Sequence, residues 1–272
     1  MVSELLHVFR NTPFGRETLM QSAFFCKRVE LTMEIYLPQY SQFLMYFDHG
    51  VVTIDLDRTF LRSPETARDH AVEIVDGLSV PYRFFDPTQF TVEKLPDLPV
   101  NYSYMCCPRS ISDLSSKIGL GFIGSRVRSI VRQARFPVFV PSVAYKEWSS
   151  VMCFFGGSAN ASAALRCARS LSDRSGTPMR IFTQAENTMA FYEEALRNAF
   201  ASEFAEPNYA EWLYFEEGEM RENLYAVPSD ALVVIGAYGH GVARDLFFGS
   251  KLEMIQTELP NPLLIVGPVC RP

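Results

Sequence analysis

The apolar and polar positions of this chain follow one pattern twice: a short apolar run, a turn, and a segment with an apolar stripe at helical spacing. Short apolar runs bounded by turn residues are typical of buried strands, and apolar positions three or four residues apart indicate helices. In the first part of the chain this pattern predicts strands at 5–9, 31–37, 80–85 and 102–107, and helices at 15–29 and 63–76, the second ending at Gly77.

The second part of the chain has the same alternation in a more regular form. It predicts strands at 150–155, 179–183, 212–215, 232–235 and 263–266, and helices at 160–172, 187–200, 219–226 and 251–259. Strands that alternate with helices indicate α/β domains in which a mostly parallel sheet is flanked by helices. We therefore expect two α/β units in tandem.

One stretch, residues 40–62, does not follow this alternation. It is rich in aromatic residues and has no clear period of two or of 3.6. We interpret it as an insertion that lies on the first unit or at an interface. Within it, Asp48-His49-Gly50 predicts a turn, because Asp and Gly favour turn conformations.

A constant offset relates the end of the first unit to the end of the second. The matched positions are Gly124-Ser125 with Gly249-Ser250, Ile130 with Ile255, Pro137 with Pro262, and Val138–Val140 with Leu263–Ile265. One offset shared over so many positions is a repeat signal. We therefore place one domain at 1–143 and a second at 144–272, with a linker near 142–148.

The stretch from Ala231 to Val266 holds the strongest functional signal. An apolar run is followed by the spacing G-x2-G-x9-G-S, and a helix-like segment comes next. Glycines let the backbone come close to a bound group, and a helix amino terminus favours anions such as phosphate. In the first unit, Ile111 and Leu114 stand where the second has its first two motif glycines. The sequence therefore predicts a phosphate-binding loop in the second unit alone.

This array resembles the nucleotide-binding signature of the ATP-binding branch of the universal stress protein family. The resemblance implies two flavodoxin-like, adenine nucleotide hydrolase-like domains with five-stranded sheets, and a ligand that is ATP or another adenine nucleotide, with or without Mg²⁺. The residues implied to contact the nucleotide are Ile235, Gly236, Gly239, Gly249, Ser250, Lys251 and Gly156. Gly156 stands in the turn where ATP-binding members usually carry an aspartate.

The resemblance also implies a way of joining the two units. Family members commonly dimerise through their last strand, which here corresponds to 138–140 and 263–265. Both segments are apolar, and an exposed apolar edge strand is prone to aggregation. We therefore expect the two strands to pair edge to edge in an intramolecular pseudo-dimer, with a homodimer as a further possibility.

Composition narrows the class of protein further. The net charge of −6 argues against nonspecific nucleic-acid binding, which needs a basic face. The start of the chain lacks a secretory signal, and no apolar run is long enough to span a membrane. Most of the six cysteines lie in apolar runs, which is typical of reduced, buried thiols, so we expect a cytoplasmic protein without a membrane partner.

No catalytic set accompanies the glycine array. The chain has neither the G-x4-G-K-[ST] motif of P-loop ATPases nor a G-x-S-x-G elbow, and none of its four histidines lies in a catalytic motif. His240, Arg244 and Lys251 are candidates to reach phosphates, and Asp245 to meet a metal. We expect sensing or signalling in a stress response rather than catalysis. A nucleotide-free interaction scaffold and a slow ATP hydrolase are the alternatives.

Overall fold

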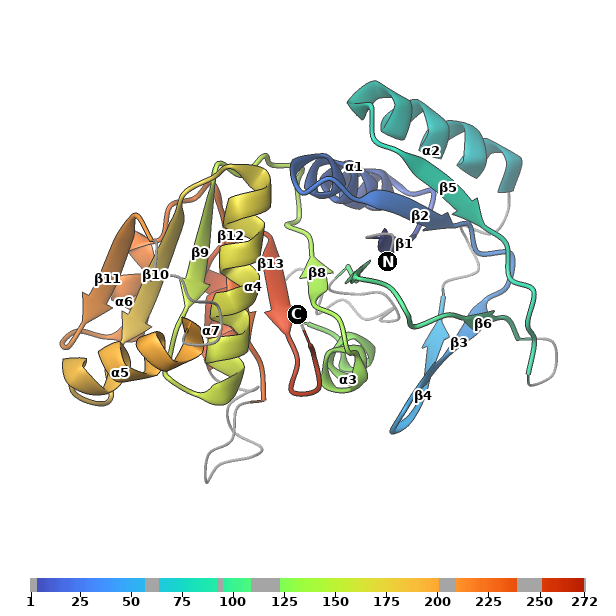
Figure 1. The fold of residues 1–272 in the computed structure, drawn as a ribbon. Helices are drawn as coiled ribbons and strands as arrows, with labels where there is room; N and C mark the ends of the chain where they lie inside the picture. Colours follow the sequence, from blue (N-terminus) through green and yellow to red (C-terminus); the bar gives the residue numbers. More distant parts are fainter. Residues whose placement is uncertain are drawn as a thin grey trace.

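A ten-stranded sheet runs through the whole molecule in the computed structural model of the chain (Figure 1). The structure describes residues 4–56, 64–91, 95–108, 123–200, 209–238 and 251–271. The strands of this sheet are β1 (Glu4–Val8), β2 (Thr32–Tyr36), β5 (Tyr82–Phe85), β7 (Tyr104–Cys106), β8 (Val138–Val140), β9 (Ser150–Phe154), β10 (Met179–Gln184), β11 (Glu211–Phe215), β12 (Ala231–Gly236) and β13 (Leu263–Val266).

Helices connect most of these strands. They are α1 (Pro13–Arg28), α2 (Pro64–Leu78), α3 (Ser125–Gln133), α4 (Ala159–Ser175), α5 (Met189–Phe200), α6 (Met220–Asn223) with the short 3-10 helix η3 (Leu224–Ala226), and α7 (Lys251–Glu258). The predicted strands and helices therefore all appear where the structure describes them. Their ends differ from the predicted ends by a few residues.

The sheet consists of two halves with the same strand order. Its order is β11-β10-β9-β12-β13-β8-β7-β1-β2-β5, so each half has its first strand in the middle and its last strand at the junction. Neighbouring strands within each half are parallel. This architecture confirms the expected fold class of two α/β units, each with a parallel five-stranded sheet.

The two halves meet at a single antiparallel strand pair. Leu263 lies opposite Val140, and Ile265 lies opposite Val138, so β13 and β8 continue one sheet across the junction. All residues of both strands are buried. The expected edge-to-edge pairing of these strands is confirmed. Because the pairing is antiparallel, the carboxyl edge of one half lies on the same side as the amino edge of the other.

Helices and a small sheet cover the two faces of the large sheet. Alternate strand residues point to opposite faces, as Leu5 and Leu6 of β1 do, and each face has its own apolar core. Helices α1, α2, α4 and α5 pack on the first face, and α3 and α7 pack on the second. Each core contains residues from both halves, so the cores are continuous across the junction.

The insertion at 40–62 forms a hairpin on the second face of the N-terminal half. Its strands are β3 (Gln42–Phe47) and β4 (Gly50–Asp55), and with β6 (Asp97–Leu98) they form a three-stranded sheet. Phe43 and Ile54 of the hairpin are fully buried in the core of that face. The C-terminal half has α6 and η3 between its third and fourth strands, whereas the N-terminal half has β6 there. The hairpin thus covers part of the second face of the N-terminal half, beside α3.

The segment between the halves is fixed to α1 rather than exposed. Both ends of the Gln21 side-chain amide are used: Nε2 donates to the carbonyls of Ser142 and Ala144, and Oε1 accepts the Ser142 N–H at 2.9 Å. Trp148 is 2 % exposed and packs edge-on against Phe24 at 5.9 Å between ring centroids. The predicted linker position therefore coincides with a packed connection. The domain boundary at 143/144 stays a prediction.

Two predicted helix ends differ in a way that has a local cause. Helix α2 continues past Gly77 to Leu78, and the residue with a positive φ of 55° is Ser79. The prediction that Gly77 ends this helix was therefore wrong. Helix α5 begins at Met189 rather than at the predicted residue 187, and the Thr188 carbonyl accepts the N–H of Phe191. Among the described residues, no helix has the length and apolar character needed to cross a membrane.

Candidate functional site

The carboxyl edge of the C-terminal half contains a topological switch point between β9 and β12. The chain leaves β9 through α4 to β10 on one side, and leaves β12 toward α7 and β13 on the other side. Helix α4 packs on the first face and α7 on the second, so the two connections diverge. Ligands of open α/β sheets bind in the crevice that such divergence creates.

The turn after β9 forms one wall of this crevice. Ser158 caps α4, because its hydroxyl accepts the N–H of Ala161 at 3.2 Å. Gly157 has a φ of +73°, and a Cβ there would lie 2.6 Å from the Phe191 ring, so this position requires glycine. Gly156, by contrast, is exposed, and a Cβ added to it would meet nothing within 4 Å. Gly156 therefore faces open space at the edge of the sheet.

The end of β12 forms the opposite wall and touches α4 directly. A Cβ on Gly236 would lie 2.5 Å from the Asn160 carbonyl oxygen, and the Asn160 side-chain amide donates to the Ala237 carbonyl at 2.5 Å. The glycine motif predicts that Gly236 allows close approach of a ligand. The structure shows that close packing of β12 on the first turn of α4 already requires glycine here.

Hydrogen bonds hold the neighbouring loops in place. The Thr183 hydroxyl donates to the Phe155 carbonyl at 2.9 Å and accepts from the Trp212 indole at 3.0 Å. The Tyr192 hydroxyl accepts the N–H of Glu186 at 2.9 Å. Phe191 remains 43 % exposed above the glycine turn. The loops at the carboxyl edge of the C-terminal half are thus held by hydrogen bonds, and the Phe191 ring is accessible there.

Tyr238, at the beginning of the glycine array, joins this edge to the other half. Its φ is +60°, its hydroxyl donates to the Arg128 carbonyl at 3.5 Å, and the Arg132 guanidinium lies 4.9 Å from its ring centroid. Burial raises the pKa of Tyr238, while Arg132 and Arg128 act in the opposite direction. Sequence reasoning did not find this contact, because nothing local in the sequence links Tyr238 to a helix of the other half.

The structure describes only part of the predicted nucleotide-binding set. Ile235 and Gly236 end β12 half-buried at the carboxyl edge, Gly156 lies in the turn after the adjacent strand β9, and Lys251 is the first described residue of α7. The remaining predicted positions lie outside the described residues: Gly239, His240, Arg244, Asp245, Gly249 and Ser250. The described members from β9 and β12 do come together on adjacent strands.

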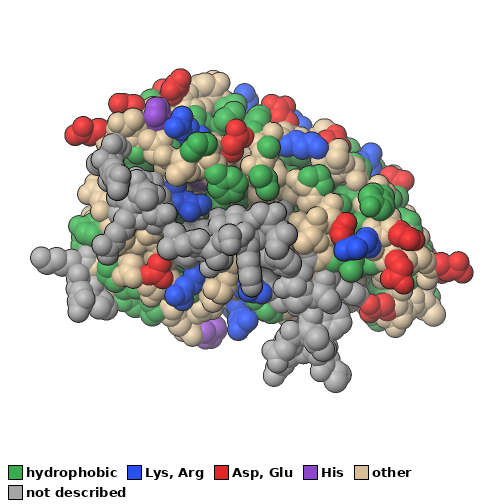
Figure 2. All heavy atoms as spheres, turned by 180° about the vertical axis from the view of Figure 1, so that it is seen from behind, with side chains coloured by type: hydrophobic (Ala, Val, Ile, Leu, Met, Phe, Trp, Pro, Cys, Tyr) green, Lys and Arg blue, Asp and Glu red, His purple; other side chains and the backbone are tan. Residues whose placement is uncertain are grey.

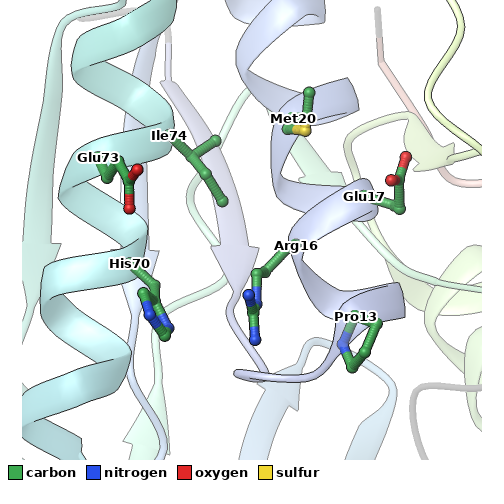
Figure 3. Close-up of a pocket in the computed structure, with 7 residues that line it drawn as sticks. All are labelled: Pro13, Arg16, Glu17, Met20, His70, Glu73 and Ile74. Atoms are coloured by element: carbon green, nitrogen blue, oxygen red, sulfur yellow. The ribbon is translucent and has the colours of Figure 1, made fainter.

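A separate groove of about 520 Å³ lies between α1 and α2 in the N-terminal half. Figure 3 shows Arg16 on α1 and His70, Glu73 and Ile74 on α2 projecting into the same space, with Glu17 turned away from α2. Glu17 accepts the Tyr145 N–H at 2.7 Å and so helps to fix the segment between the halves. The groove carries charges of both signs, and it is remote in the fold from the predicted nucleotide residues.

A buried histidine in β1 has neighbours that resemble catalytic groups. His7 Nδ1 lies 2.9 Å from the Ser22 hydroxyl, and Cys106 lies on the adjacent strand β7 opposite His7. All three side chains are buried. Burial lowers the pKa of His7 to about 3, helped by Arg10, and raises the pKa of Cys106 to about 12. Neither group is ionised at neutral pH or open to a substrate, so this cluster belongs to the core.

No group of three or more metal-ligating side chains occurs among the residues that the structure describes. The buried carboxylate of Glu34 is instead held by Tyr102 and by Arg83, whose Nε lies 2.5 Å from Glu34 Oε1. A buried carboxylate that is paired in this way is a stable structural feature. All six cysteines are free thiols, and five of them are buried, as expected.

No family model and no curated protein matches the sequence. The fold is similar to that of a universal stress protein from Archaeoglobus fulgidus DSM 4304, with a TM-score of 0.61 at 15% identity, covering 98% of this chain and 97% of that one. A putative universal stress protein from Pseudomonas aeruginosa UCBPP-PA14 follows, with a TM-score of 0.57 at 10% identity, covering 98% and 94% of the two chains.

A protein of unknown function from Pseudomonas aeruginosa PAO1 is similar to the same degree, with a TM-score of 0.56 at 10% identity over 98% of this chain and 93% of that one. At such low identity the likeness concerns the fold. It extends over nearly the full length of both chains in each case. The chain therefore has the fold of the universal stress proteins.

Proposed function

We propose that this chain is a tandem universal stress protein whose C-terminal half binds an adenine nucleotide, ATP or AMP, and acts in stress response or signalling rather than in catalysis. The observation that carries the proposal is the switch point between β9 and β12, which two glycine-containing turns border. Gly156 leaves open space on one side, and β12 leads into the G-x2-G-x9-G-S array on the other.

The proposed pose follows from the chemistry of the two walls. The base and ribose lie toward Gly156 and the exposed ring of Phe191, because an aromatic face stacks well on a nucleobase. The phosphates lie toward Gly239, Gly249, Ser250 and Lys251, where backbone N–H groups and the start of α7 favour anions. Mg²⁺, if bound, would accompany the phosphates. Residues 1–143 then serve as structural support.

The test is a pair of valine substitutions with a matched control. Gly156→Val adds a branched side chain where the free protein has room, so the fold is retained and a ligand at this wall is displaced. Gly239→Val places a branched side chain at the phosphate end. Gly77→Val in α2 is the control, because it too has nothing within 4 Å. Titration calorimetry with ATP should show weaker binding in the first two variants only. Unchanged binding in both variants refutes the site.

A nucleotide-free interaction scaffold is the second candidate. One observation favours it: Gly156 provides no carboxylate in the turn after β9, where the resemblance leads us to expect an aspartate. The discriminating measurement is native mass spectrometry of the purified protein, with an acid extract analysed for nucleotides. A co-purified adenine nucleotide supports the first candidate. Absence of nucleotide together with no ATP binding by calorimetry supports the scaffold.

A further inference from the structure

We infer that the groove between α1 and α2 is a second binding site, for a small zwitterion with an apolar side chain, such as an α-amino acid. Arg16 of α1 binds the carboxylate, and His70 and Glu73 of α2 bind the ammonium group. The inference goes beyond the proposed function, which concerns the C-terminal half, and does not depend on it.

One stripe of each helix lines this groove. The stripe of α1 includes Arg16 and Met20, and the stripe of α2 consists of His70, Glu73 and Ile74. Residues three or four positions apart lie on the same side of a helix, so each stripe is continuous. The groove volume of about 520 Å³ lies within the range of about 300–1,000 Å³ that is usual for small-ligand sites.

Charges of both signs face the groove and do not pair with each other. Arg16 and Glu73 are exposed and lie on opposite helices. Among the residues that the structure describes, neither takes part in an ion pair. Figure 2, which views the molecule from behind, shows acidic and basic side chains and a histidine gathered at the upper left, over the region of α2. A ligand with a positive and a negative group can pair with both charges at once.

A hydrogen bond fixes the role of His70. Its Nδ1 lies 3.0 Å from Asn11 Oδ1, and an amide oxygen only accepts hydrogen bonds, so Nδ1 carries the proton of the neutral ring. Nε2 is then the acceptor nitrogen. Glu73 follows three positions later on the same side of α2 and is a second acceptor. Two acceptors on one helix suit an ammonium group, which only donates.

The α1 wall suits a carboxylate. The guanidinium of Arg16 has planar N–H groups that match the two oxygens of a carboxylate. Glu17, which would repel a carboxylate, is turned away from α2 (Figure 3) and accepts the Tyr145 N–H at 2.7 Å. Met20 and Ile74 are half-buried apolar residues of the same groove, one from each helix. The apolar side chain of the ligand therefore lies against these two residues.

Both walls are held in place by the fold itself. Helix α1 is fixed by Gln21, whose side-chain amide donates to the Ser142 carbonyl at 2.9 Å. Helix α2 is fixed by Ala71 and Val75, which are fully buried, and by Arg68, whose guanidinium lies 4.1 Å from the Phe84 ring centroid. Walls that are already fixed reduce the loss of conformational entropy on binding.

The experiment follows the ring signals of the four histidines by NMR, with His70 assigned as the signal that is lost in His70→Gln. The probes are leucine, isocaproate, which lacks the ammonium group, and isoamylamine, which lacks the carboxylate. All three carry the same branched apolar chain. Leucine should shift the His70 signal in a saturable way and leave that of His49, in the hairpin turn, unchanged. Each analogue should bind about tenfold more weakly, because one charged group of the groove is left without a partner.

Arg16→Gln and Glu73→Gln should each weaken leucine binding about tenfold or more, since a charge-assisted hydrogen bond is lost. The matched controls are Lys27→Gln on α1 and Glu65→Gln on α2, which remove the same charges at exposed positions outside the groove. Both controls should bind leucine like wild type. Thermal melts check that all variants are folded.

Weakening confined to the two groove variants, with both analogues weaker than leucine, supports the zwitterion site. A His70 signal that leucine does not shift in a saturable way overturns the inference. Isocaproate that binds as tightly as leucine also overturns it, because the groove is then a site for anions. Equal weakening in a groove variant and its control does so as well, because the effect is then one of net charge.

Discussion

His7 shows how one buried side chain contributes to the pH dependence of stability. Burial lowers the pKa of His7 to about 3 in the folded protein, whereas the ordinary value is 6.5. The unfolded chain therefore takes up a proton below about pH 6.5 that the folded protein binds only near pH 3. The stabilising contribution is complete above pH 6.5 and is lost as the pH falls toward 3.

We predict that His7→Gln makes unfolding less dependent on pH. In wild type, this histidine adds up to about 1.4 kcal/mol per pH unit to the loss of unfolding free energy between pH 6.5 and 3. The measurement is urea unfolding at several pH values in that window. His49→Gln is the control, because His49 is exposed in the hairpin turn. Wild type and His7→Gln with parallel pH dependence would contradict the assignment.

Gly236 shows that a motif glycine can have a structural reason apart from a ligand. We predict that Gly236→Ala lowers the free energy of unfolding by about 1–3 kcal/mol, because the added methyl group collides with the Asn160 backbone. Gly156→Ala, which has free space, should change stability little. Urea unfolding of the two variants without nucleotide gives the comparison. Equal stability of both variants would show that β12 can shift away from α4 at no cost.

The elements differ in how well the sequence predicts them. Buried parallel strands such as Leu263–Val266 are continuous apolar runs, and this composition identifies them without tertiary information. The strands of the hairpin β3–β4 were not predicted. Phe43 and Met45 on one face and Leu44 on the other are all buried, so the sequence shows no alternation of apolar and polar residues there. The burial of these residues depends on contacts with β6 and α3, which are distant in sequence.

At the junction, the pairing of β8 and β13 should make the two halves unfold together. Phe139 of β8 is 1 % exposed and stacks on Phe25 at 4.8 Å between ring centroids. The two tryptophans report on different places: Trp148 on the segment between the halves, and Trp212 on β11 at the far edge. Each single-tryptophan protein, made by changing the other to Phe, therefore follows one region.

We predict that Phe139→Ala lowers the unfolding midpoint equally in both single-tryptophan proteins, by the equivalent of about 3–5 kcal/mol for a large buried ring. Coincident shifts are expected because the apolar cores continue across the junction. Tyr225→Ala is the control, since Tyr225 is 84% exposed. A shift seen by Trp148 fluorescence and absent from Trp212 fluorescence would show that the halves are independent.

For the whole molecule, the sequence predicted the order of elements and the joining of the halves, but only part of the candidate site. Local spacing predicted the strand that ends at Gly236 and the helix at Lys251–Glu258, because apolar runs and helical periodicity are short-range features, whereas the nucleotide contacts stay a prediction. The contact of Tyr238 with Arg132 depends on the antiparallel junction and on the path of α3. No local pattern encodes such a contact, so only the assembled sheet reveals it.

From the residues of the proposed site we expect that ATP hydrolysis is absent or very slow. Fast phosphoryl transfer needs a positioned water, a base and stabilisation of the developing charge. The segment between β12 and α7 contains His240 and Arg244 as candidate phosphate partners, and its one carboxylate, Asp245, directly follows Arg244, with which it can pair. A described carboxylate of this edge is Glu186, which follows β10. Its backbone N–H donates to the Tyr192 hydroxyl. If Asp245 pairs with Arg244 in this way, it is not available as a base, and binding of a nucleotide without turnover is what the proposed sensor requires.

The measurement is phosphate release under single-turnover conditions, with protein in excess over ATP and Mg²⁺ present. We expect a rate far below about 1 per second, the lower end of ordinary enzymes. Asp245→Ala and His240→Ala should leave this slow rate unchanged, because neither residue acts as a base in a binding site. A rate of about 1 per second or more that disappears in either variant would identify the missing base and make the protein a hydrolase. Because His240 and Asp245 variants can also change ATP binding, the ATP affinity of each variant has to be measured as well. A rate that falls only in proportion to the amount of bound ATP does not identify a base and leaves the sensor proposal standing.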